Sequence, residues 1–389
     1  MTEFEKQYQE LIQLMEFEDY TLLTKRIIDL TLDTESISHY QKTADFLDWI
    51  DIGGHTPEAK KEKFTSVLNV LHQTLSTKPI PEKKIIIAAK KLTKSYGNSQ
   101  FSLGPIDLEI AQGEILGLVG ENGNGKTTLL RLLCGELYAT YGKLDYNFDH
   151  SDQFDLRSQL VYIPQRTETW YGSMFENLQF TAANYGYSAA ENGLITELTI
   201  ARLGLRKYRN HSWKSLSSGY KMRFELARML LRKPKILLID EPLANLDILA
   251  QQTVLEDFRA IAKSPFRPLG IVLSSQQLYE VEKTSDQVIF LKNGVQKNLH
   301  QQLVIENPDE VQPENFLVIE FESSFSQGQL GEIFKNYGLL TLHFNGGTYI
   351  ATFPESLTIF DFMELLVKHQ VPVLYFRNIS NSTRRFFVS

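Results

Sequence analysis

The stretch that decides the fold is Gly120-Glu121-Asn122-Gly123-Asn124-Gly125-Lys126-Thr127-Thr128. It matches the pattern of a phosphate-binding loop, in which one glycine is followed five positions later by Gly-Lys-Thr. The apolar run before it, residues 115–119, predicts a strand, and the run after it, residues 129–133, predicts a helix. This strand–loop–helix order is the setting that the motif requires, and it disfavours the alternative of a glycine-rich turn with a chance lysine.

The loop has the chemistry of a nucleotide site. Glycines let backbone N–H groups converge on phosphate oxygens without Cβ clashes. The start of the following helix adds unpaired N–H donors and a partial positive charge. We expect Lys126 to reach the β- and γ-phosphates and the Thr127 hydroxyl to ligate Mg²⁺. All residues from Gly120 to Thr128 are therefore candidate ATP-binding residues.

Length and composition bound the remaining possibilities. A chain of 389 residues suggests two or three domains, and 42% apolar with 22% charged residues is the composition of an ordinary soluble protein. No apolar run approaches the roughly eighteen residues that span a bilayer. The N-terminus lacks a signal-peptide core, and the single cysteine, Cys134, excludes an internal disulfide and predicts a buried, inert thiol. The simplest location is cytoplasmic.

The charge distribution gives no sign of a nucleic-acid partner. The formal net charge is −7, and no basic stripe marks a face for DNA or RNA. We also expect no metal cluster.

Residues 1–77 are predicted to form a helical bundle of unknown role. Four apolar stripes recur at helical spacing, and their simplest interpretation is the bundle's own core. The Thr56-Pro57 pair has the form of a helix start. The stripes are Phe4, Tyr8, Leu11, Ile12 and Met15; Leu23, Ile27 and Leu30; Ile37, Tyr40, Ala44 and Leu47; and Phe64, Val67, Leu68, Leu71 and Leu75.

Residues 78–84, with two prolines and a charge cluster, are predicted to be a linker, and strands begin at Ile85. Continuous apolar strands that alternate with helices over residues 85–299 predict a parallel α/β sheet covered on both faces. The expected strands are 85–89, 105–110, 115–119, 160–165, 235–241, 269–275 and 287–292, with a hairpin turn at Asn293-Gly294. Residues 300–315 are a second predicted linker. Residues 316–389 read as βαββαβ, a split βαβ or ferredoxin-like unit.

Two carboxylates end the predicted strand 235–241. Asp240 is placed to hold Mg²⁺, and Glu241 to orient the attacking water. The alternative, an acidic pair that caps the sheet edge, is weakened by the phosphate loop in the same sheet. Between these motifs, Ser217 and Gly219 lie in a Ser-x-Gly turn before an apolar helix, where a hydroxyl and helix N–H groups can face an anion. Alone, such a turn is usually a helix cap.

The order of Tyr96, residues 120–128, Gln165, residues 216–220 and Asp240-Glu241 resembles the nucleotide-binding subunit of ABC (ATP-binding cassette) transporters. The resemblance implies an α/β P-loop NTPase that binds ATP and Mg²⁺ over residues 85–299. It implies that Tyr96 stacks on adenine, although an ordinary edge aromatic is the alternative. It also implies that Gln165 contacts Mg²⁺ and senses a membrane partner. Residues 244–247 would be the D-loop at the dimer interface.

The same resemblance implies a head-to-tail dimer, homomeric or heteromeric, in which Ser217 and Gly219 close on ATP held by a second subunit. Two positions depart from the family pattern. The signature reads Leu216-Ser217-Ser218-Gly219-Tyr220 instead of Leu-Ser-Gly-Gly-Gln. Gln276 stands where the family has a switch histidine, and glutamine can hydrogen-bond a phosphate or water but cannot carry a proton. The expected catalytic set is Glu241, Lys126 and Gln276, and the rate of ATP hydrolysis is its least certain property.

The tail, residues 316–389, is similar to the C-terminal domain of exporter-type (ABC-2-like) ATPases. We therefore expect an ATPase that is peripheral on the inner face of the cell membrane and drives transmembrane permease subunits on separate chains. One alternative is a weakly hydrolysing, nucleotide-dependent regulatory module, to which Gln276 points. Another is a soluble ABC ATPase that acts on ribosomes or DNA; the single cassette and the lack of sustained heptads disfavour it.

Overall fold

The computed structural model describes residues 2–97, 101–244, 246–276, 278–297, 316–345 and 347–380. Its N-terminal part consists of helices only. The helices are α1 (Glu3–Glu16), α2 (Tyr20–Asp33), α3 (Ile37–Ile52) and α4 (Pro57–Leu75). The predicted start of α4 is confirmed: the Thr56 side chain accepts a hydrogen bond from the Ala59 N–H, and Pro57 is the first helical residue.

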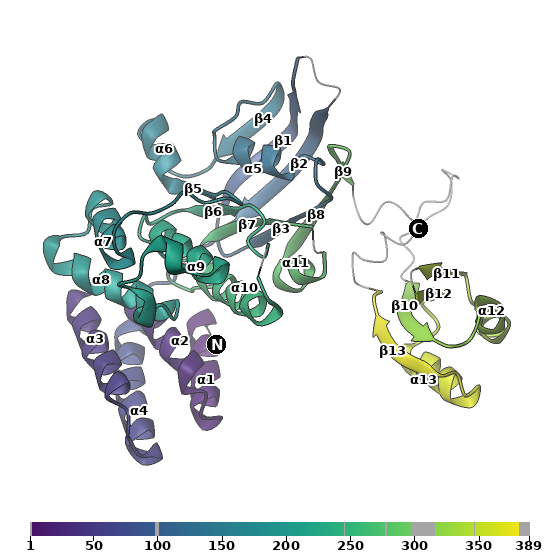
Figure 1. Cartoon of the computed structure of the whole chain (residues 1–389), viewed down its shortest axis with the longest axis horizontal. Coiled ribbons are helices and arrows are strands. Elements are labelled where there is room, and N and C mark those ends of the chain that lie inside the picture. Colours follow the sequence, from purple (N-terminus) through teal and green to yellow (C-terminus); the bar gives the residue numbers. More distant parts are fainter. Residues whose placement is uncertain are drawn as a thin grey trace.

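The apolar stripes of the bundle do not all pack within the bundle. Most of them form one core, in which Phe46 and Phe64 meet edge to face. Tyr40 and Leu47 of α3, together with Ile28 of α2, instead join the core of the ATP-binding part of the chain. The interpretation of the third stripe as bundle core is therefore wrong, because α2 and α3 lie against helix α8 (Ala189–Arg202) (Figure 1). Periodicity shows which face of a helix is buried but not against what.

The central sheet has the strand order β5-β6-β7-β3-β8-β9. Neighbours are parallel except for β8 and β9, which form the predicted hairpin at Asn293-Gly294 with positive φ at both residues. The bounds are β3 (Ile115–Val119), β5 (Leu160–Ile163), β6 (Ile236–Ile239), β7 (Gly270–Ser275), β8 (Gln287–Lys292) and β9 (Val295–Lys297).

Alternate residues of these strands enter two different cores, so the sheet is covered on both faces as predicted. One face packs on helices, among them α7, α8 and α9. The other packs on α5 and on a second, antiparallel sheet of order β2-β1-β4. Its first two strands were expected, but their place in a separate antiparallel sheet and the third strand were not. The antiparallel strands are β1 (Ile85–Ser95), β2 (Ser102–Ala111) and β4 (Tyr141–Tyr146).

We call α7, α8 and α9 the helical layer, since each contacts the other two. Two 3₁₀ turns, Arg206–Tyr208 and Trp213–Ser215, join α8 to α9. The helices of this part are α5 (Lys126–Leu133), α6 (Gln153–Gln159), α7 (Met174–Asn184), α8 (Ala189–Arg202), α9 (Ser218–Leu230), α10 (Ile248–Ala262) and α11 (Leu278–Thr284). In Figure 1 the helical layer lies between the bundle and the central sheet.

The C-terminal unit has the predicted βαββαβ element order. Its four strands pair antiparallel in the order β11-β12-β10-β13 around a phenylalanine core. The elements are β10 (Phe316–Ser323), α12 (Gln327–Lys335), β11 (Thr341–Asn345), β12 (Thr348–Pro354), α13 (Ile359–Lys368) and β13 (Val373–Asn378). The predicted linker 300–315 lies outside the described residues. In the described part of the chain, no helix is both long and apolar enough to cross a bilayer.

Candidate nucleotide-binding site

The loop of residues 120–128 leaves β3 and enters α5, as the motif predicts. Gly123 and Gly125 adopt positive φ angles of 84° and 96°, a conformation that favours glycine. A Cβ on Gly120 would lie 2.5 Å from the Leu291 carbonyl oxygen of β8. These positions need glycine for backbone reasons, and the resulting turn is the type that directs N–H groups toward an anion.

Asn124 fixes the loop from the side. Its Oδ1 atom accepts a hydrogen bond of 3.0 Å from the Asn293 N–H in the β8–β9 turn, and the side chain is buried. The side chain of this predicted ATP-binding residue therefore anchors the loop, and its backbone N–H donates to the Glu121 carbonyl oxygen at 3.3 Å within the loop.

Lys126 lies almost fully buried beneath the loop. Its ammonium donates to the carbonyl oxygens of Gly120 at 2.6 Å and Glu121 at 3.3 Å, and lies 3.2 Å from Glu241 Oε1. The cation is thus held between the phosphate loop and a predicted catalytic carboxylate. A phosphate group that enters the loop would compete with this carboxylate for the ammonium.

Asp240 accepts three hydrogen bonds at the end of β6. The Thr127 hydroxyl donates to Oδ2 at 2.7 Å, the Tyr162 hydroxyl to the same oxygen at 3.3 Å, and the Ser274 hydroxyl to Oδ1 at 2.6 Å. Burial and the neighbouring Asp240 charge raise the pKa of Tyr162, so its phenol stays a neutral donor. Thr127 and Asp240, both predicted magnesium ligands, are in direct contact and offer the oxygen donors that Mg²⁺ prefers.

Glu241 is held in an unusual backbone conformation. Its φ angle is +50°, which is rare for a residue with a side chain. Its N–H donates to Ser274 Oγ at 2.9 Å, and its Oε2 accepts from the Gln276 N–H at 3.3 Å. Backbone strain of this kind clusters at functional sites, so it supports a functional rather than a capping role for Glu241.

Ser274 is a site residue that sequence reasoning missed. This fully buried hydroxyl bonds both to the Asp240 carboxylate and to the Glu241 backbone, and thereby positions the two acids together. Its only signal in the sequence is its place at the end of a predicted strand. Because β6 and β7 are adjacent and parallel, their carboxyl ends meet, and a serine there lies within reach of Asp240.

The two predicted glutamines lie at the same edge of the sheet. Gln165 is exposed two residues after the end of β5, which pairs with β6. Gln276 is exposed directly after β7, and its backbone bonds Glu241. The roles of their side chains toward ATP and Mg²⁺ stay predictions.

Tyr96 directly follows β1 and is 39% exposed. The Lys94 ammonium lies over its ring, 5.5 Å from the centroid. An open aromatic face is what adenine stacking needs, and the edge-aromatic alternative stays open.

Ser217 and Gly219 lie at the start of α9. Ser217 is the N-cap residue and is exposed, yet its side chain makes no capping hydrogen bond. Position 219 packs toward Leu246 and Ala250 of the segment after the carboxylates. In that segment Asn245 lies outside the described residues, and Asp247 caps α10 through the Ala250 N–H. A free N-cap hydroxyl on a helix of 13 residues fits an anion site better than a cap.

Together, a parallel sheet, a phosphate loop and two carboxylates at one edge define a P-loop nucleoside triphosphatase. A family model described as "ABC transporter" matches residues 103–244, which include the loop, the signature turn and the carboxylates. The ABC transporter ATP-binding protein NatA of Bacillus subtilis is 31% identical over 198 residues, which cover 49% of this chain and 77% of NatA. The chain therefore belongs to the family of ABC transporter ATP-binding proteins.

Two further similarities are narrower. The lactococcin transport/processing ATP-binding protein LcnC-like of Lactococcus lactis is 29% identical over 231 residues, but these cover only 31% of that protein's length. The solved structure of cbiO1 from Clostridium perfringens, described as part of the ABC transporter complex cbiONQ, superposes with a TM-score of 0.51 at 24% identity. That match covers 55% of this chain and 87% of cbiO1, and it supports the fold.

Proposed function

We propose that this chain is the ATP-hydrolysing subunit of an ABC exporter, which dimerises head to tail around ATP and Mg²⁺ and drives a separate transmembrane permease. The observation that carries the proposal is the convergence of Lys126, the Thr127–Asp240 pair and Glu241 at one edge of the central sheet. Cationic, metal-binding and water-orienting groups are the parts that phosphoryl transfer to water requires.

Each residue has one task in this proposal. Thr127 and Asp240 hold Mg²⁺, with Gln165 as a further oxygen donor. When bound, the ion neutralises charge that develops on the phosphate oxygens. Lys126 leaves Glu241 for the β- and γ-phosphates, which frees the carboxylate to orient and polarise the attacking water. Gln276, whose backbone already contacts Glu241, hydrogen-bonds the γ-phosphate or that water.

A second subunit completes the site through Ser217 and Gly219. The uncapped Ser217 hydroxyl supports this step, because it is free to donate to a phosphate oxygen of ATP on the partner. The second copy is either this chain or another cassette. Tyr220 replaces the family's usual glutamine, and its hydroxyl accepts a hydrogen bond of 2.7 Å from the Tyr208 hydroxyl. This pair gives the signature turn a support within its own subunit.

The dimer is tested by size-exclusion chromatography of the Glu241→Gln variant, which should bind ATP without consuming it. We expect ATP to shift this variant from monomer to dimer, and Ser217→Arg in the same background to stay monomeric with its ATP affinity unchanged. Ser38→Arg, which makes the same substitution at an exposed serine of α3, is the matched control and should dimerise. Dimers of Ser217→Arg would contradict the proposed site.

The permease partner and the exporter direction rest on two observations. No helix in the described ranges could span a membrane, and the C-terminal unit has the βαββαβ order expected of exporter-type ATPases. Sedimentation with membranes only when permease genes from the same neighbourhood are co-expressed would support the proposal. Equal sedimentation without them would favour the soluble alternatives. The Gln276 departure favours one second candidate, a nucleotide-dependent regulatory module with slow turnover.

A further inference from the structure

We propose that the N-terminal bundle fixes the angle between the helical layer and the ATP-binding core, by which we mean the central sheet together with α10. We call the bundle in this role a brace, and Arg202 is the positioning residue through which it acts. Arg202 ends α8 and is buried between three elements. Its Nε donates to Asp29 of α2 at 2.9 Å, and its Nη1 donates to Asp257 of α10 at 2.7 Å. One guanidinium therefore joins the bundle, the layer and the core.

The charges around Arg202 balance within this cluster. Lys25 of α2 lies 3.3 Å from Asp257, and Arg26 lies 3.3 Å from Asp29 and 3.8 Å from Glu256. A buried guanidinium with two carboxylates in fixed geometry tolerates little change in the angle between the helices that carry them. Burial is the largest influence on Asp29 and opposes its ionisation. The charge and hydrogen bond of Arg202, together with the charges of Arg26 and Arg267, outweigh burial and hold the pKa of Asp29 below its ordinary value.

The bundle grips the layer and the core at separate points. The bundle contacts the helical layer through apolar side chains and an ion pair. Ile28, Tyr40 and Leu47 join the hydrophobic cluster beside α8, and Arg206, in the 3₁₀ turn after α8, pairs with Asp48 at 2.7 Å. On the core, Asp33 accepts from Arg267 Nε at 2.6 Å in the loop after α10.

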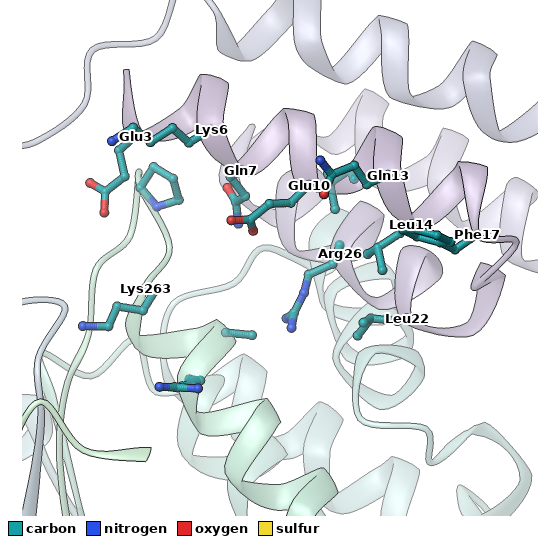
Figure 2. Close-up of a pocket in the computed structure, with 14 residues that line it drawn as sticks. Glu3, Lys6, Gln7, Glu10, Gln13, Leu14, Phe17, Leu22, Arg26 and Lys263 are labelled. Atoms are coloured by element: carbon teal, nitrogen blue, oxygen red, sulfur yellow. The ribbon is translucent and has the colours of Figure 1, made fainter. Parts of the chain in front are cut away.

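The bundle is open along one side of α10. A groove of about 550 Å³ separates α1 from the C-terminal half of α10, and Figure 2 shows Arg26 pointing into it. Phe17 and Leu22 line it from the bundle side, and Arg259 from α10. Beside this groove α2 and α10 are connected through the ion cluster of Arg202, Asp29 and Asp257. Substitutions in this cluster should therefore weaken the attachment of the bundle to α10.

The helical layer carries the signature turn, so its angle decides where Ser217 and Gly219 stand. The chain runs from Arg202 through two 3₁₀ turns, fixed by the buried Trp213, to the α9 N-cap at Ser217. At the other end of the brace, α10 follows the segment after Glu241. The effect on ATP-driven closure rests on the proposed function, whereas the fixed angle between layer and core does not.

The brace is tested by the distance between spin labels at Lys214→Cys beside the signature turn and Gln252→Cys on α10, both exposed positions. Cys134 can stay, because it is buried and burial raises the pKa of its thiol to about 11. Arg202→Lys keeps the charge but loses the fork that reaches both carboxylates. Arg157→Lys is the matched control, since it makes the same substitution at an exposed arginine of α6, whose guanidinium donates to the Gly135 carbonyl oxygen and has no part in the ion cluster.

We expect the distance distribution of the full-length protein to broaden or shift with Arg202→Lys and to stay at the parent width with Arg157→Lys. Asp29→Asn is a second, isosteric route to the same broadening should Arg202→Lys fold poorly. In the Glu241→Gln background, Arg202→Lys should raise the ATP concentration for half-maximal dimerisation about fivefold, with ATP affinity of the monomer unchanged.

The two readouts separate the two proposals. Parent-like distance distributions in both Arg202→Lys and Asp29→Asn would overturn the brace, whatever their thermal stability. A broadened distribution with no ATP-dependent dimer in any variant would keep the brace and count against the proposed function. Equal broadening by Arg202→Lys and Arg157→Lys would also overturn the role of Arg202, because the change would then not depend on the ion cluster.

Discussion

Asp240 and Glu241 are neighbours in the chain but have different partners in the structure. The Asp240 carboxylate accepts hydrogen bonds from hydroxyl groups, whereas the Glu241 carboxylate faces the Lys126 ammonium and the backbone N–H of Gln276. A carboxylate that accepts several hydroxyl donors is oriented as a metal ligand, and one that shares a cation with the phosphate loop is released when phosphate arrives. Ser274 supports both arrangements with one hydroxyl group.

Ser274→Ala should lower ATP turnover about tenfold, because it removes a hydrogen bond to a charged group and leaves the Glu241 N–H without its acceptor. The Mg²⁺ concentration for half-maximal activity should rise, and ATP binding without Mg²⁺ should stay unchanged. Ser158→Ala, which removes a hydroxyl bonded within its own helix, is the control. Steady-state phosphate release measures both; an unchanged Mg²⁺ dependence would contradict the role given to Ser274.

Gln276→His should raise turnover several-fold, because histidine can donate to the γ-phosphate and also carry a proton near neutral pH. Gln252→His, at an exposed position of α10, is the control and should change nothing. The measurement is the steady-state rate at saturating ATP. If Gln276→His has the parent rate, the missing histidine does not limit turnover.

At this scale the phosphate loop and both carboxylates were predictable, because their spacing reports backbone requirements that hold in any such sheet. Ser274 and Tyr162 were not, since their roles depend on which strands are neighbours. The anchoring role of the Asn124 side chain was missed for the same reason: its partner, Asn293, is 169 positions away.

Helix α2 is the element on which the arrangement of the molecule depends. Two aspartates one turn apart, Asp29 and Asp33, face the layer and the core respectively. Their environments shift their pKa values in opposite directions. At Asp29 the neighbouring arginines, Arg202 foremost, together outweigh burial, so its pKa lies below the ordinary 3.8. At Asp33 burial dominates and raises the pKa.

The two aspartates should therefore give opposite pH trends in stability. A lowered pKa contributes stability above the ordinary value that is lost as pH falls through the folded pKa. The stability advantage of the parent over Asp29→Asn, of about 1–3 kcal/mol, should thus shrink below pH 3.8. A raised pKa has the opposite effect on stability. The free energy of unfolding of the parent should therefore rise relative to that of Asp33→Asn as the pH falls through the raised pKa of Asp33. Denaturant unfolding between pH 3 and 7 measures both, and parallel trends would contradict the assignment.

Apolar strands and periodic helices were predictable because the spacing of apolar residues along the sequence indicates which side chains are buried. Strand β4, with the sequence Tyr-Gly-Lys-Leu-Asp-Tyr, was missed because no side of it is fully buried and its pattern is not apolar. The third stripe of the bundle was assigned to the wrong core, because Tyr40 and Leu47 pack on a helix about 150 residues later.

In the whole molecule, the sheet presents the loop and the carboxylates at one edge, and the helical layer carries the signature turn. The bundle grips both through α2. Fold class and family followed from the order of motifs, which is set by the connectivity of the sheet. The brace did not, since it depends on ion pairs such as that between Asp29 and Arg202, which lie 173 positions apart.

The most direct test of the central claim is the steady-state rate of Mg²⁺-dependent ATP hydrolysis by the parent and by Glu241→Gln, with ATP binding measured beside it. We predict that both bind ATP with similar affinity and that Glu241→Gln is slower by roughly a hundredfold or more, because its amide cannot accept a proton from the attacking water. Equal rates in the two proteins would contradict the claim that this site hydrolyses ATP.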